Sequence, residues 1–311
     1  MAGSGRVPPR MGTSDVRRIE EETELLRRVD YEQGGAACRD RAIVAAAWND
    51  GTLRAAAAPG VRRRLLVALA DQHNLAAWAG FDTGLVRSPE RHWARARELA
   101  QEAGHRELVA NVHYRVGRLR LHHRDPLGAL SSFHSGLSVS SGAHTTALLT
   151  ANCAWASARL GDSGEAVRCL RVARGAFDRG ATPAGGWARF FDEADFSAMT
   201  GVVLTELVGG GEAGHGSEAV EALTAAVRGY SAGMARSRTF CLIALATMCL
   251  HRNDFDGAAE AGGRAVASAG AIGSSRVADR LAVVRELADR HPGEDGARRL
   301  AASIAAFVPP G

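Results

Sequence analysis

Residues 111–136 read NVHYRVGRLRLHHRDPLGALSSFHSG, and this stretch decides the fold. Two helical segments flank a turn at 124–126, where Asp125 can cap the helix that follows. We expect Gly117 and Ala129 to stand where the two helices cross, since small side chains let the backbones approach closely, and Phe133 to fill the space behind the crossing. The stretch therefore predicts a tightly packed pair of antiparallel helices.

The same arrangement recurs along the chain. The small residue that opens the second helix of each pair recurs after 37, 53 and 39 residues, at Ala129, Ala166, Ala219 and Ala258. The tetratricopeptide (TPR) repeat has a period of about 34 residues, and the longest interval holds glycine-rich insertions at 185–186 and 209–216. We therefore predict an all-α chain, a TPR-like right-handed superhelical solenoid of antiparallel helix pairs. A generic alanine-rich helical bundle is the alternative.

Composition also favours helices. Hydrophobic residues, many of them alanine, make up 46% of the 311 residues, whereas aromatic residues make up only 5%. Alanine favours helices, and strands prefer β-branched and aromatic residues. A capping pattern at Thr13 and Ser14 begins the first predicted helix. We expect residues 1–12 to form a disordered tail and residues 13–311 to form one TPR-like helical repeat domain.

Charge and cysteine usage exclude several classes of protein. The net charge of +4 is a weak hint of nucleic-acid binding. All 38 basic residues are arginine, which is typical of the coding bias of a GC-rich genome and weakens that interpretation. The five cysteines are scattered without a C-x-x-C pair, so we expect reduced, packed thiols instead of disulfides or a zinc site. The sequence begins without an apolar leader and has no long apolar segment. We therefore expect a cytoplasmic protein with no membrane partner.

Five segments carry a resemblance to a known family. They are WARFFDEAD (187–195), MARSRTF (234–240), SRVADR (275–280), AWAGFDTGL (77–85) and ANCAWA (151–156). Together they resemble the TPR transcriptional regulators of actinobacteria, and the likeness covers nearly the whole chain from about Met11. The layout is more distantly similar to the peptide-responsive regulators of Gram-positive bacteria, some of which act by binding other proteins.

The resemblance implies a regulatory binding module. Its ligand would be a peptide or protein partner in the concave groove, and binding would influence transcription or development. The usual family member begins with a helix-turn-helix domain, but only about a dozen residues precede the first predicted helix here. We therefore expect a separate DNA-binding protein as a partner. Related regulators often pair through terminal helices, so the resemblance also implies a homodimer.

The repeat register assigns residues to the groove, because the first helix of each pair lines the concave face of such a solenoid. The twelve assigned residues are Asn74, Trp78, Asp82, Asn111, Tyr114, Arg118, His122, Asn152, Trp155, Arg159, Asp195 and Met199.

These residue types suit an extended peptide. Asparagine amides can both donate to and accept from a peptide backbone. The rings of Trp78, Tyr114 and Trp155 offer flat apolar area, and Arg118 and Arg159 can hold a carboxylate in fork geometry. The alternative is that the tryptophans belong to the core and the asparagines are surface caps.

Other groups carry weaker signals. Most histidines fall between His73 and His144 without metal-site spacing, so we expect no metal and no cofactor. We expect Asp192 and Asp195 to pair with arginines such as Arg189 or Arg236. The arginine runs at 62–64 and 115–120 suggest the alternative function, direct DNA binding through arginine-rich helix faces, although a solvated helix face is the simpler interpretation. No nucleophile, phosphate-loop or metal motif is present, so we predict no enzyme.

Overall fold

The computed structural model describes residues 9–85, 87–180, 183 and 185–308, and this part of the chain is all-helical. It contains fourteen α-helices and no strand beyond an isolated bridge between Arg10 and Ala56. The predicted all-α class is therefore confirmed. Positions 1–8 of the expected disordered tail lie outside the described residues. The expectation is wrong for the end of the tail, because Met11 is buried and its backbone N–H donates to the Ala56 carbonyl at 2.9 Å.

The helices, in chain order, are α1 (Thr13–Gln33), α2 (Arg39–Asp50), α3 (Pro59–Asp82), α4 (Ser88–Glu102), α5 (Arg106–His122), α6 (Pro126–Val139), α7 (Ala143–Arg159), α8 (Ser163–Asp178), α9 (Glu193–Gly209), α10 (Gly216–Gly229), α11 (Ala235–His251), α12 (Phe255–Ala269), α13 (Ser275–Ala288) and α14 (Asp295–Ala305).

Short capped turns join the two helices of several pairs. Asp125, Asp162 and Asp254 each accept a hydrogen bond from the backbone N–H three residues further on, at the start of α6, α8 and α12. The residue before each of these aspartates has a positive φ, and at two of the turns it is Arg124 (60°) or Asn253 (59°). A left-handed residue ends one helix and the aspartate starts the next. The capped turn predicted at Asp125 is confirmed.

Consecutive helices pack as pairs from α3 onward, with α4, α6, α8, α10 and α12 each against the helix before it. The four alanines predicted at the crossings, from Ala129 to Ala258, are fully buried. At the best-defined crossing, a Cβ atom added to Gly117 would overlap the Phe133 ring. Glycine is therefore needed there so that α5 and α6 can approach closely.

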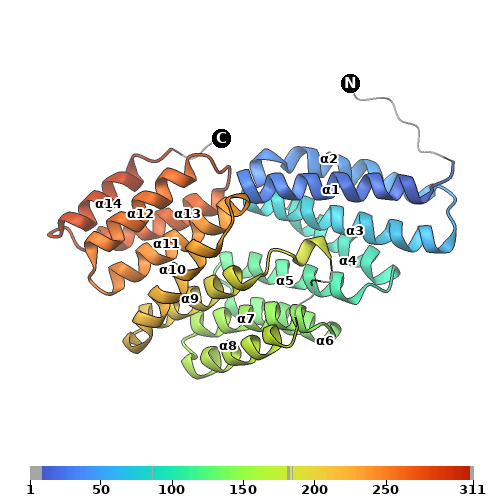
Figure 1. The fold of residues 1–311 in the computed structure, drawn as a ribbon. Helices are drawn as coiled ribbons and strands as arrows, with labels where there is room; N and C mark the ends of the chain where they lie inside the picture. The colour runs from blue at the N-terminus through green and yellow to red at the C-terminus, as the bar shows by residue number, and fades with distance from the viewer. Residues whose placement is uncertain (1–8, 86, 181–182, 184, 309–311) are drawn as a thin grey trace.

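The row of helices closes on itself. Helix α1 packs against α3 and also against α11 and the short 3-10 turn η5 (Ala232–Met234). Two backbone hydrogen bonds link the end of α1 to the turn before α13, from Ala36 N–H to the Gly273 carbonyl (3.0 Å) and from Gly273 N–H to the Gln33 carbonyl (2.8 Å). In Figure 1 the C-terminal helices accordingly return to the side of α1 and α2. The odd-numbered helices therefore surround a central space.

The crossing at Gly117 gives a stability prediction. Gly117→Ala should lower the free energy of unfolding by about 1–3 kcal/mol, because the added methyl group overpacks against Phe133. The matched control is Gly263→Ala in α12, where an added Cβ meets no atom within 4 Å and should stabilise the helix by about 0.5–1 kcal/mol. Urea denaturation measures both. Shifts of the same sign and size would contradict the close crossing.

Candidate ligand-binding pocket

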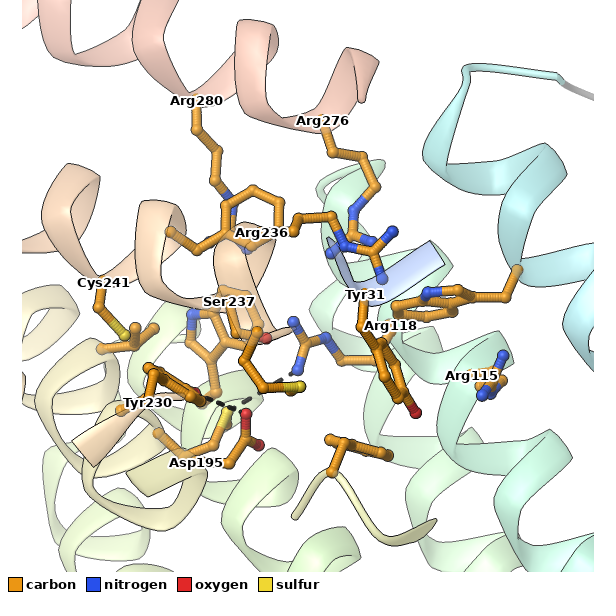
Figure 2. Close-up of a pocket in the computed structure, with 18 of the residues that line it drawn as sticks. Tyr31, Arg115, Arg118, Asp195, Tyr230, Arg236, Ser237, Cys241, Arg276 and Arg280 are labelled. Carbon is orange, nitrogen blue, oxygen red and sulfur yellow. Dashed lines mark hydrogen bonds between the residues drawn. The ribbon is translucent and has the colours of Figure 1, made fainter. Parts of the chain in front are cut away.

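A pocket lies at the centre of the closed row of helices. It encloses about 740 Å³ of empty space, including the part that opens to solvent. Its lining comes from every odd-numbered helix, from α1 through α13, and from the segments before α9 and α11. Five arginines, seven aromatic residues and a single carboxylate, Asp195, are among the nineteen lining residues. Figure 2 shows the arginines reaching into this space from α5, α11 and α13.

Half of the predicted groove residues line this pocket. They are Trp78, Tyr114, Arg118, Trp155, Asp195 and Met199. They lie on α3, α5, α7 and α9, the first helices of four consecutive pairs. The register therefore identified the inward-facing side of these helices. The inner surface itself is a pocket instead of the expected open groove, because α1 closes against α11.

The three predicted asparagines do not face the pocket. Asn74 is fully buried, donates to Asn111 Oδ1 at 2.9 Å and accepts a bond from Trp93 Nε1 at 3.2 Å. Asn152 donates to the Leu148 carbonyl at 2.8 Å. Asn74 and Asn152 thus donate to the protein itself, and Asn111 accepts from Asn74, so none of the three predicted asparagines lines the pocket.

Three further predicted residues also lie outside the pocket lining. Arg159 Nε contacts Glu206 at 2.9 Å, so its own chain already supplies the carboxylate that we expected from a ligand. His122 lies edge-on to Phe81, and burial, together with nearby arginines, lowers the pKa of its imidazole to about 4. It is therefore neutral near pH 7. Asp82 is fully buried beside the pocket wall.

Asp82 accepts four hydrogen bonds from distant parts of the chain. Its donors are Gly35 N–H (2.9 Å), Arg236 Nη1 (2.8 Å), Ser274 Oγ (2.9 Å) and Arg276 Nη1 (3.1 Å). Burial alone would raise the pKa of Asp82, but Arg236 and Arg276 outweigh burial and hold it below the usual range. We call Asp30, Asp82, Arg236 and Arg276 the closure network, because it ties α1 and α3 to α11 and α13.

Asp30 completes the closure network from α1. Both of its carboxylate oxygens accept from Arg236, at 2.8 and 2.6 Å. The sequence therefore assigned the wrong partner to Arg236. Asp192 instead caps α9 by accepting from the Asp195 backbone N–H, and Arg189 lies near Glu24 at 3.5 Å.

The aromatic walls of the pocket carry arginines. The Arg118 guanidinium lies 4.8 Å from the Trp155 ring centroid, and that of Arg280 lies 5.3 Å from the same centroid and 4.4 Å from that of Phe240. Cations are attracted to ring faces, more strongly where water is excluded. Trp78 and Trp155 are only 8% and 5% exposed, so they are both buried and part of the pocket wall.

Asp195, the carboxylate that lines the pocket, is not part of the closure network. Tyr230 Oη donates to its carboxylate at 2.7 Å, as the dashed line in Figure 2 marks. Burial raises the pKa of Asp195 to about 6, although the Tyr230 hydrogen bond and the charge of Arg118 oppose the rise. The carboxylate therefore titrates near physiological pH.

The arginine run at 62–64 contacts other parts of the same chain. Arg63 donates to the Ala103 carbonyl at 2.9 Å, Arg64 contacts Glu20, and Arg62 contacts Glu102 at 3.7 Å. These contacts do not favour DNA binding by this run over a solvated helix face. The described histidines, cysteines and carboxylates form no group of three that could hold a metal ion. The five cysteines are buried and unbridged, as predicted.

No protein-family model matches this sequence, and no curated protein matches it either. Along the described part of the chain, no helix has both the length and the apolar character that a membrane crossing requires.

The closure network gives a second prediction. Asp82→Asn should lower the free energy of unfolding by about 3–5 kcal/mol near neutral pH, because it leaves buried Arg236 and Arg276 short of a partner. The matched control is Asp256→Asn, whose ion pair with Arg299 is 88% exposed on the aspartate side and should cost at most about 1 kcal/mol.

The loss of stability in Asp82→Asn should depend on pH, because the pKa of Asp82 is lowered in the folded protein. The stabilising contribution of Asp82 is present above the usual aspartate pKa of about 3.9 and is lost as the pH falls through its folded-state pKa. Urea denaturation at decreasing pH should therefore show the wild type and Asp82→Asn converging in acid. Equal stability near neutral pH would contradict the role of the network.

The Asp195–Tyr230 pair gives a third prediction. The carboxyl carbon of Asp195, followed by NMR, should titrate with a midpoint near pH 6. Tyr230→Phe should move this midpoint upward, because the lost hydrogen bond favoured the charged carboxylate. Arg228→Gln, on the exposed face of α10, should leave the midpoint in place. A wild-type midpoint near that of a free aspartate would show that the site is wetter than the structure indicates.

Proposed function

We propose that the chain is a TPR-like, right-handed superhelix of antiparallel helix pairs, related to the actinobacterial TPR regulators. Three observations support the proposal: the consecutive packed pairs, the buried small residues at the crossings, and the odd-numbered helices facing a common centre. In such a superhelix the inner wall is the binding surface.

The proposed function is regulatory recognition of a peptide or protein segment in the central pocket, which then influences transcription or development through a partner such as a separate DNA-binding protein. The observation that carries the proposal is the composition of the pocket. A folding core is dominated by apolar side chains, whereas this cavity gathers five arginines and seven aromatic residues from six helices and from the segments before α9 and α11. Convergent polar groups in an apolar concavity are typical of ligand sites.

We assign binding in preference to catalysis. The pocket thiol, Cys241, is buried, and burial raises its pKa, so the nucleophilic thiolate is disfavoured. Asp195 is bonded to Tyr230, whose phenol stays protonated near neutral pH because burial raises its pKa well above the usual range. The arginines are suited to holding a charged ligand in place.

Peptide selection tests the proposed function. A displayed library of linear peptides is panned against the purified chain, and the selected peptides are titrated by fluorescence polarisation. Ser237→Trp fills the pocket that Ser237 lines and should weaken binding at least about tenfold. The matched control, Ser131→Trp on the exposed face of α6, should bind as the wild type does.

Two outcomes would count against the proposal. The first is selection of no peptide, and the second is equal binding by the wild type and Ser237→Trp. A mobility shift with duplex DNA, run in parallel at low salt, tests the alternative of direct DNA binding. If the chain binds duplex DNA more tightly than it binds the selected peptides, that result would favour direct DNA binding.

A further inference from the structure

The charges around the pocket do not balance. Arg236 and Arg276 face the buried carboxylates of Asp30 and Asp82. Three other lining arginines, Arg115, Arg118 and Arg280, make no salt bridge within the described part of the chain, and Asp195 is the single lining carboxylate. Even with Asp195 ionised, the pocket therefore has an excess of two positive charges. Buried charge without a partner is costly, so this excess points to a ligand of opposite sign.

The unpaired donors converge on one part of the pocket. Arg118 and Arg280 approach the same Trp155 ring from α5 and α13, and Figure 2 shows Arg280 extending down from α13 and Arg118 entering the pocket from α5. Arg118 has only weak partners, Asn152 Oδ1 at 3.3 Å and Met199 Sδ at 3.8 Å. Burial and the charges of neighbouring arginines, Arg118 among them, lower the pKa of Arg280. Two guanidinium groups beside the same ring therefore favour an anion with more than one charge.

A second pair of unsatisfied donors lies on the side of α1. Arg115 is 3% exposed, and its Nε has no hydrogen-bond partner among the described residues. The hydroxyl of Tyr31 is likewise buried and unpartnered. Both residues line the pocket. Buried polar groups are almost always hydrogen-bonded, so these two donors mark the place of a polar group that the ligand brings.

The rest of the lining selects a flat apolar body. Tyr114 and Phe190 stack with their ring centroids 5.9 Å apart, and Phe240, Met199 and Val202 add apolar surface. Aromatic rings pack well against such walls. A charged group alone would leave this surface uncovered.

We propose that the ligand of this pocket carries a compact group with two negative charges attached to an aromatic ring, and that Arg118 and Arg280 bind that group. The inference rests on the proposed function only in taking this pocket as the ligand site. The two negative charges offset the excess of two positive charges, and the ring fills the aromatic part of the cavity. The source is either a free aryl dianion or a side chain of a peptide.

Calorimetric titration with simple probes tests the inference. Phenyl phosphate carries both the dianion and the ring, whereas benzoate has a single charge and inorganic phosphate has no ring. Near neutral pH, phenyl phosphate should bind at least about tenfold more tightly than either of the other two. Equal binding of benzoate would overturn the requirement for two charges, and equal binding of inorganic phosphate would overturn the aromatic part.

Substitutions test the assigned residues. Arg118→Gln and Arg280→Gln should each weaken phenyl phosphate binding at least about tenfold. Arg280→Gln should also raise the melting temperature of the ligand-free chain, because it removes a buried cation that lies among other cations. Lost binding in that variant therefore does not come from unfolding. Arg228→Gln, at an exposed position, is the matched control. Unchanged binding in both pocket variants would overturn the proposal.

A short peptide with phosphotyrosine, titrated beside free phenyl phosphate, identifies the source. Tighter binding of the peptide supports a peptide ligand, and equal binding supports a free small molecule. If no probe binds while selected peptides bind in a manner that Ser237→Trp abolishes, this inference fails and the proposed function stands. If phenyl phosphate binds through Arg118 and Arg280 while no peptide is selected, peptide recognition fails and the ligand chemistry stands.

Discussion

The fully buried carboxylate of Asp82 is the constraint on which the closed arrangement depends. Its four donors come from the turn after α1, from α11, from the residue before α13 and from α13 itself, and the donor most distant in sequence, Arg276, lies 194 residues away. A carboxylate can remain charged in such a place only when its partners are present together. Closure of the helix row is therefore cooperative: the N-terminal and C-terminal helices must arrive in register, or Asp82, Asp30 and Arg236 are left buried and unpaired.

The same constraint shapes the pocket. Because Arg236 and Arg276 must reach inward to Asp82, they bring positive charge to the inner wall, where Arg118 and Arg280 add more. Burial lowers the pKa of Arg276 to about 10 even though Asp82 supports its charge. The pocket thus holds charge that the fold does not need for closure. A charge excess of this kind lowers the stability of the empty protein, which is a common feature of binding sites.

The sequence predicts local features well and distant ones poorly. The capped turn at Asp125 and the crossing of Gly117 with Phe133 depend on residues within a single helix pair, and the structure confirms both. The bond between Asp30 and Arg236 spans 206 residues, and no spacing rule connects them. The predicted asparagines do not line the pocket for a more specific reason. Asn74 and Asn111 are 37 residues apart. The repeat that gives them equivalent positions also places them side by side on neighbouring helices, where they bond to each other.

Closure and ligand binding are consequently one equilibrium. The proposed ligand contacts Arg118 on α5 and Arg280 on α13, and Tyr31 on α1 faces the same space. These groups lie together only when α1 is packed against α11, so a ligand that needs all of them binds the closed form and stabilises it by mass action. Asp82 touches no part of the cavity, yet weakening its bonds should reduce the population that can bind. A ligand at the centre would thereby stabilise the junction of α1 with α11.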